Sequence, residues 1–104
     1  MLAKRARSVD PLLVEPLWAL AFAAELRGNL PLALARYEQA TREQPQNAQT
    51  WLAAGQFALN NDCARRALLL LYRFNDLDPK ARPSEGPDDY RRALRLVNSG
   101  KPTC

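Results

Sequence analysis

The sequence predicts an all-α fold built from helical hairpins. Apolar residues make up 47% of the 104 residues, and most are Ala and Leu, which lose little side-chain entropy in a helix. Pro11, Pro45 and Pro79 are evenly spaced along the chain. A fixed period of this length, about 34 residues, indicates a repeat in which each unit is one supersecondary element. The length fits a single domain.

Five helices are expected from the apolar periodicity and the turn signals. Asn29 is placed to cap the second helix and Asn47 the third, while Asn61 or Asp62 is placed to cap the fourth. Boundaries of this kind are set by side chains that accept hydrogen bonds from the first free N–H groups of a helix. The expected helices cover residues 12–27, 30–43, 48–59, 62–76 and 87–98.

The repeat is interrupted after the second period. Residues 78–88 contain three prolines and one glycine, which predicts an ordered loop or short linker. Beyond it, apolar residues recur at i, i+3, i+4 and i+7, so one side of the last helix is apolar. These residues are Tyr90, Ala93, Leu94 and Val97. We interpret this helix as a cap over the last repeat, whose apolar side would otherwise face water.

The pattern of large and small residues within each period resembles the tetratricopeptide repeat. In the second unit the matching residues are Trp51, Ala54, Gly55, Ala58, Ala67, Leu71 and Pro79. In the first unit they are Leu17, Leu20, Ala21, Ala24, Ala33, Tyr37, Ala40 and Pro45, with Gly28 at the turn between the helices. Four positions depart from the family pattern. Ala24 and Ala58 replace the large aromatic residue that the family often shows, Phe74 stands where a small residue is usual, and Asp62 stands where the turn usually has glycine.

The resemblance implies an α-solenoid of antiparallel helical hairpins with a C-terminal capping helix. We divide the chain into the tail of a preceding repeat (1–11), a first repeat (14–47), a second repeat (48–81), and a proline-rich loop with the capping helix (82–104). Small residues are expected where two helices cross closely, and large ones between the helices. Because residues 2–8 look like half of a repeat, we expect the chain to be the C-terminal part of a longer protein.

The resemblance also implies a function, because the first helices of such repeats line a concave groove that holds a partner polypeptide. The groove positions are Glu15, Trp18, Phe22, Glu25 and Leu26 in the first unit, and Gln49, Leu52, Gln56, Leu59 and Asn60 in the second. Their mixed apolar and amide character favours an apolar or amphipathic segment of a partner protein. Trp18 and Phe22 are the most prominent pair, although Trp18 could instead pack on a neighbouring repeat.

A second interpretation comes from two short segments, residues 11–21 (PLLVEPLWALA) and residues 75–79 (NDLDP). They are similar to the soluble extracytoplasmic repeat tails of bacterial membrane glycan polymerases of the O-antigen ligase type. That resemblance would place the chain outside the cytoplasm and would allow a disulfide between Cys63 and Cys104. The residues themselves leave the state of these two cysteines open, and a cytoplasmic location remains the alternative.

Several functions are not expected. The chain has no histidine, the commonest general base and metal ligand, so we expect neither an enzyme nor a metal or organic cofactor. The net charge is only +4, and arginines alternate with acidic residues, so no nucleic acid is expected as partner. Apolar runs are too short for a membrane span. Two copies could pair through the N-terminal end, at Leu2, Leu12, Leu13 and Trp18.

Overall fold

The computed structural model of the chain describes residues 15–100 and residue 104. These residues form α-helices and one short 3-10 helix and include no strand, so the all-α prediction is confirmed. The helices are α2 (Glu15–Leu26), α3 (Leu30–Glu43), α4 (Ala48–Asn60), α5 (Ala64–Leu77) and α6 (Pro87–Asn98), and the 3-10 helix η2 (Pro83–Glu85) precedes α6. The predicted tail of a preceding repeat, residues 1–11, lies outside the described residues.

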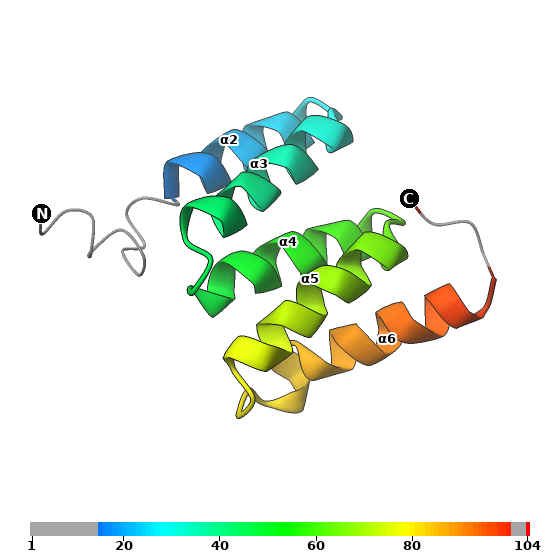
Figure 1. Cartoon of the computed structure of the whole chain (residues 1–104). Helices are drawn as coiled ribbons and strands as arrows, with labels where there is room; N and C mark the ends of the chain where they lie inside the picture. The colour runs from blue at the N-terminus through cyan, green and yellow to red at the C-terminus, as the bar shows by residue number, and fades with distance from the viewer. Residues whose placement is uncertain (1–14, 101–103) are drawn as a thin grey trace, which may run out of the picture.

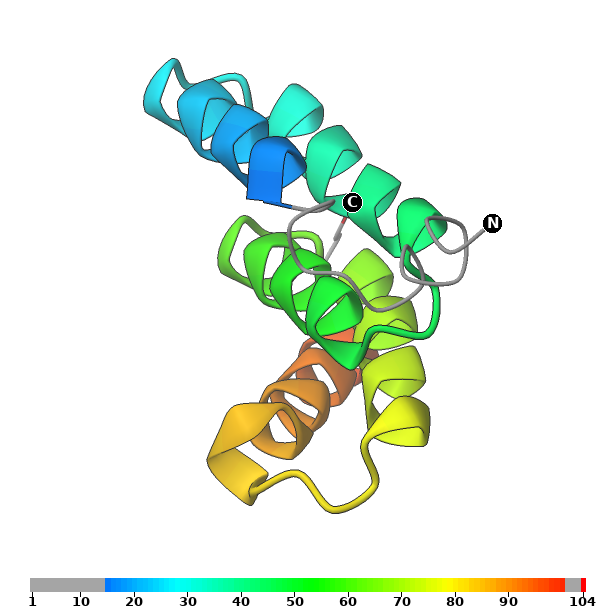
Figure 2. The same cartoon turned by 90° about the vertical axis from the view of Figure 1, so that its left-hand side faces the viewer.

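The helices are stacked in the order of the chain. Each of α2, α3, α4 and α5 packs against the helix that follows it. Figures 1 and 2 show α2 and α3 as one antiparallel pair, α4 and α5 as a second pair, and α6 beside the second pair on the side away from the first. The molecule is accordingly elongated and thin, with extents of 48 × 35 × 18 Å.

Small residues lie where the helices of a pair approach most closely. Ala33 and Ala67 are completely buried, as expected from their equivalent positions in the two periods. In α4, a methyl group added to Gly55 would lie 2.7 Å from Cγ and Cδ2 of Leu71, too close for an ordinary van der Waals contact. Gly55 therefore sets the distance between α4 and α5, and Leu71 fills the space beside it.

Two asparagines cap helices as predicted. The Asn29 side chain accepts a hydrogen bond from the Leu32 N–H at the start of α3. Asn47 accepts one from the Gln49 N–H at the start of α4. Each satisfies a backbone N–H that has no partner within its helix, so both helices begin where the sequence indicates.

The predicted cap of α5 is wrong. The N-cap residue is Cys63, and its side chain makes no capping hydrogen bond. Asn61 instead donates its side-chain amide to the Phe57 carbonyl. Asp62 has φ 64°, close to the 74° of Gly28 at the equivalent turn of the first pair. Asp62 therefore supplies the left-handed backbone that closes the turn, a conformation that Asp tolerates better than most residues.

The loop before α6 explains why a large residue occupies a usually small position. Phe74 is completely buried near the end of α5. Gly86, the residue before α6, has φ 138°, and a methyl group added to it would overlap the Phe74 ring. A large side chain in α5 is thus matched by a missing side chain in the loop, and this contact fixes where α6 begins.

Leu20 is a predicted core position that the structure exposes, with an accessible fraction of 50%. Its counterpart one period later, Ala54, belongs to a buried cluster against which Leu34 and Tyr37 of α3 pack. In the second pair, α4 packs against the preceding helix, α3. Among the described residues, no preceding helix packs against α2 in the equivalent place. The prediction for Leu20 fails because this neighbour is missing from the described part of the chain.

Candidate functional site

The predicted groove residues of α2 fall into two groups. Phe22 and Leu26 are exposed, with accessible fractions of 58% and 73%. Trp18 is half-buried, and Glu25 accepts a hydrogen bond of 2.9 Å from the Tyr37 hydroxyl. Glu15 is the first residue of α2, and its side chain is outside the described part. The exposed apolar residues among the predicted groove positions of this helix are therefore Phe22 and Leu26, which lie one turn apart.

The predicted groove residues of α4 are largely occupied by α6. The Gln56 side chain donates to the Asp89 carboxylate at 3.0 Å, and Arg92 donates to the Asn60 side chain at 2.9 Å. Leu59 is buried in the core. Leu59 is therefore not a surface residue as we expected, because the helix after the proline-rich loop packs over the end of α4.

The two remaining residues of α4 lie nearer its start. Gln49 is exposed, and Leu52 is half-buried, packing against the main core cluster. Both precede the part of α4 that α6 covers. The exposed residues among the predicted groove positions are therefore Phe22, Leu26, Gln49 and Asn60, and binding of a partner to them remains a prediction.

Trp18 has an unusual environment for an indole. Its Nε1 atom is buried and finds no hydrogen-bond acceptor within the described chain. A buried indole N–H usually has a partner, since leaving it unpaired costs free energy. The other tryptophan differs, because Trp51 donates from Nε1 to the Pro45 carbonyl at 2.9 Å, and the Arg73 guanidinium lies 5.9 Å from its ring centroid.

The hydrogen bond between Tyr37 and Glu25 joins the two helices of the first pair. Burial, together with this hydrogen bond and the nearby charge of Glu25, raises the pKa of Tyr37 to about 12. The Tyr37 ring also packs against Phe57 of α4, with ring centroids 5.0 Å apart. Tyr37 therefore links α2, α3 and α4 and holds the carboxylate of Glu25 in a fixed place.

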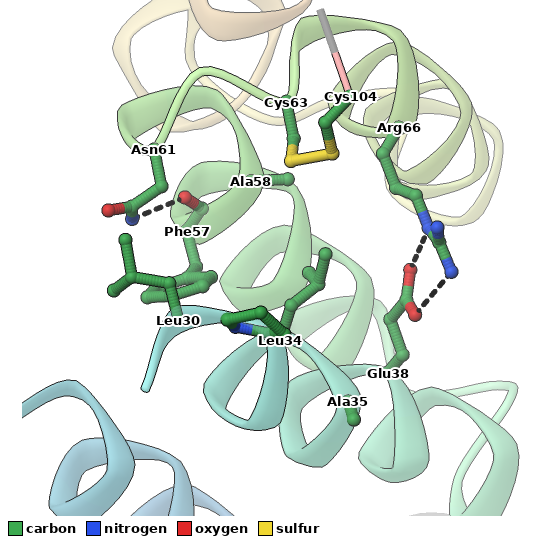
Figure 3. Close-up of a pocket in the computed structure, with 11 residues that line it drawn as sticks. Leu30, Leu34, Ala35, Glu38, Phe57, Ala58, Asn61, Cys63, Arg66 and Cys104 are labelled. Atoms are coloured by element: carbon green, nitrogen blue, oxygen red, sulfur yellow. Dashed lines mark hydrogen bonds and ion pairs between the residues drawn. A yellow bond between two sulfur atoms is a disulfide. The ribbon is translucent and has the colours of Figure 1, made fainter. Parts of the chain in front are cut away.

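A pocket that the sequence did not indicate lies between α3 and α5 (Figure 3). Its volume is about 390 Å³. It is lined by Leu30, Pro31, Leu34, Ala35 and Glu38 from α3, Phe57, Ala58 and Asn61 from the end of α4 and the turn, and Cys63, Arg66 and Cys104. Because these residues come from three separate segments, no local pattern in the sequence marks the pocket.

One end of the pocket carries an ion pair. Arg66 donates to both carboxylate oxygens of Glu38, at 2.7 and 2.9 Å. These hydrogen bonds and the Glu38 charge raise the pKa of the Arg66 guanidinium above its usual value. Arg66 is half-exposed, so screening by solvent keeps the contribution of the pair to stability small. The pair leaves this end of the pocket polar but electrically balanced.

The side of the pocket across from Leu34 is formed by a disulfide between Cys63 and Cys104 (Figure 3). Figure 3 shows both sulfur atoms above Ala58, on the far side of the pocket from Leu34. The two cysteines are separated by 41 residues. Composition left their state open, because only the return of the chain past α6 brings Cys104 to the turn between α4 and α5.

Neither a metal site nor a membrane span is found in the described residues. No three His, Cys, Asp or Glu side chains of this part of the chain are grouped to hold a metal ion. None of its helices has the length and apolar character needed to cross a membrane. No protein-family model matches the chain, and a search among curated proteins finds no match either.

Proposed function

We propose that this protein is a non-catalytic interaction module of the tetratricopeptide type that holds an apolar or amphipathic segment of a partner protein. The observation that carries the proposal is the exposure of Phe22 and Leu26, 58% and 73% accessible, on the same side of α2. Large apolar side chains exposed together often mark an interaction site. They also lie at two of the positions that line the groove in the resembling family.

The equivalence of the two helical pairs supports the repeat interpretation. Ala33 and Ala67, one period apart, are both buried. The turns at Gly28 and Asp62, again one period apart, both have a left-handed residue. Pro45 follows the C-cap of α3 in the same way that Pro79 follows that of α5. A sequence period that recurs as a structural period is what a helical repeat requires.

The surface favours a partner that presents apolar side chains one helical turn apart. Phe22 and Leu26 offer two adjacent apolar contacts, and Leu52 lies on α4, half-buried. Glu25 is already hydrogen-bonded to Tyr37, so its carboxylate is a fixed group beside the apolar pair. This combination suits an amphipathic helix.

A displayed library of random helical peptides, selected on the whole chain, tests the proposal. Selected peptides should bind the Phe22→Ser/Leu26→Ser variant at least about tenfold more weakly, because large exposed apolar residues carry most of the free energy at such contacts. Leu69→Ser/Tyr72→Ser is the matched control, since these residues of α5 are similarly exposed. If both variants bind the selected peptides equally weakly, or if neither binds them more weakly than the wild type, the assignment of the site to α2 is refuted.

Light scattering over a range of concentrations complements the selection. It distinguishes a partner segment from a second copy of the same chain, the alternative occupant of the α2 surface. If the chain forms a dimer and Phe22→Ser/Leu26→Ser dissociates it, the occupant of the α2 surface is a second copy of the chain and not a partner segment. A monomer at all concentrations leaves the surface to a different protein.

A second candidate is the extracytoplasmic repeat tail of a bacterial membrane glycan polymerase, and the disulfide favours it. Disulfides persist in oxidising compartments and are rare in the cytoplasm, and the fold places Cys63 and Cys104 in bonding contact. In material exported to an oxidising compartment, thiol titration should find both cysteines blocked. Two free thiols in well-folded exported protein would refute this candidate and leave the first one untouched.

A further inference from the structure

Two contacts hold Cys104 at the turn between α4 and α5. Within the described residues, it is held by the disulfide to Cys63 and by a hydrogen bond of 3.3 Å from its backbone N–H to the Asp62 carbonyl. Both anchors are in the turn between α4 and α5. The contact is therefore a clasp, formed by Cys63 and Cys104, that ties a residue beyond α6 to the start of α5.

The same clasp forms part of the pocket between α3 and α5. Cys104 lines the pocket together with Cys63, and the apolar side chains of Leu30 and Leu34 lie on the other side (Figure 3). Cys104 is exposed and Cys63 is half-buried, so a small thiol can reach the bond from solvent. The shape of the pocket on this side thus depends on one covalent bond that is accessible to solvent.

We propose that the Cys63–Cys104 disulfide is a redox-sensitive clasp that controls access to this pocket. In the oxidised protein, Cys104 closes one side of the pocket. Reduction by an external dithiol breaks the bond between the two sulfur atoms, and the backbone hydrogen bond to Asp62 is then the remaining anchor of Cys104 among the described residues. Cys104 then departs, and the pocket opens toward solvent over Ala58 and the start of α5.

The position of Cys63 determines the direction of the exchange. Cys63 is the N-cap of α5 and makes no capping hydrogen bond as a disulfide, so its sulfur belongs to the residue at the N-terminus of the helix, where the first N–H groups have no partner within the helix. A thiolate at this position is stabilised by those N–H groups and by the helix dipole. Since the more stable thiolate leaves faster, an external thiolate attacks the Cys104 sulfur and Cys63 leaves.

The reaction balances without any further reactant. The first thiol of the dithiol forms a mixed disulfide with Cys104, and the Cys63 thiolate takes up a proton. The second thiol then attacks the sulfur of the dithiol in this mixed disulfide and releases the Cys104 thiol. Two electrons pass from the dithiol, which becomes a cyclic disulfide, to the protein, which gains two thiols.

Opening the clasp leaves the helices in place, because α6 has other attachments. Its Ala93 is completely buried in the core, and the rings of Tyr72 and Tyr90 lie 6.5 Å apart between α5 and α6. The hydrogen bond from Gln56 to Asp89 also remains. The effect of reduction is therefore local to the pocket.

Amide and methyl NMR spectra of the whole chain, with and without dithiothreitol, test the clasp. Reduction should shift the signals of Leu30, Leu34 and Ala58 as well as those of the cysteines, while the signals of Phe22 and Leu26 stay unchanged. The Cys63→Ala/Cys104→Ala variant is the redox-inert control, and should show the opened pocket under both conditions. Shifts confined to the two cysteines, or a loss of helix on reduction, would overturn the proposal.

The direction of exchange has its own test. Brief exposure to reduced glutathione, followed by alkylation and peptide mapping by mass spectrometry, shows which cysteine carries the mixed disulfide. Cys104 should carry it in several-fold excess over Cys63. Equal labelling, or an excess on Cys63, would overturn the role assigned to the start of α5. The variants Cys63→Ser and Cys104→Ser, each oxidised with glutathione, supply the reference peptides.

Discussion

The two tryptophans differ in what their indole N–H groups meet, and this difference is testable. Trp18→Phe removes a buried donor that has no acceptor among the described residues, so stability should stay constant or rise by up to about 1 kcal/mol. Trp51→Phe removes the hydrogen bond to the Pro45 carbonyl and should cost about 1 kcal/mol. Urea unfolding followed by circular dichroism measures both, and a larger loss for Trp18→Phe would contradict this interpretation.

The raised pKa of Tyr37 predicts a pH dependence of stability. An unfolded tyrosine loses its proton near pH 10, whereas folded Tyr37 keeps it to about pH 12. Between these values the unfolded chain binds fewer protons, so the stabilisation by Tyr37 is complete below pH 10 and is lost as the pH rises toward 12. Below pH 10, Tyr37→Phe should cost about 1 kcal/mol through the lost hydrogen bond.

The measurement is the free energy of unfolding of the wild type and of Tyr37→Phe between pH 8 and pH 11.5. The difference between the two should shrink above pH 10. Tyr72→Phe, which makes the same substitution at an exposed tyrosine, is the control. A constant difference for Tyr37→Phe over the whole range would show that burial and Glu25 do not hold the proton.

At the scale of elements, the sequence predicts helix positions well and the start of α5 poorly. The bounds of α3 and α6 agree with the expected residues, because proline and asparagine signals mark their ends. The start of α5 differs because Asp62 takes a left-handed backbone conformation and belongs to the turn. The sequence shows only that Asp62 is a residue type able to cap a helix, and this does not reveal its backbone conformation. Cys63, the actual cap, is used by the disulfide, and this pairing depends on a contact 41 residues away.

The contact between Phe74 and Gly86 is the element-scale feature with the largest expected effect. Gly86→Ala places a methyl group against the buried Phe74 ring at a φ of 138°, where a side chain is strained whatever the space. We expect a loss of about 2 kcal/mol or more from the overlap and the backbone strain together. The docking of α6 should weaken with it, because η2 and Gly86 lead directly into that helix.

Gly100→Ala provides the control for this substitution. Gly100 also has a positive φ, 78°, but a methyl group there meets nothing within 4 Å. Its cost should therefore be limited to backbone strain, about 1 kcal/mol. Thermal unfolding of both variants separates the two contributions. If Gly86→Ala lowers the stability no more than Gly100→Ala does, the overlap with the Phe74 ring makes no contribution, and the burial of Phe74 does not require glycine at position 86.

At the scale of the whole molecule, the candidate site could be predicted only in part. Phe22 and Leu26, which the family resemblance predicts to line a groove, are exposed on α2, and their role in binding stays a prediction. The repeat period could not show that α6 forms hydrogen bonds with Gln56 and Asn60, or that Leu59 is buried. That contact depends on how the proline-rich loop returns the chain, and a non-repeating loop has no counterpart earlier in the sequence from which to infer its path.

The order of stacking predicts that stability is unevenly distributed along the molecule. α5 packs against both α4 and α6, whereas the main described neighbour of α2 is α3, and much of its apolar surface is exposed. A helix with fewer neighbours loses less buried surface when it opens, so it opens at a lower free energy than the core. Native-state hydrogen exchange should therefore give lower opening free energies for the amides of α2 than for those of α5.

A helical peptide selected on the α2 surface refines this prediction. If it binds beside Phe22 and Leu26, it should raise the opening free energy of α2 and leave that of α5 nearly unchanged, because binding stabilises the units that it contacts. Phe22→Ser/Leu26→Ser should abolish the increase. Equal opening free energies in α2 and α5 would instead mean that the five helices unfold as one cooperative unit. The exposed side of α2 would then not lower the free energy at which this helix opens.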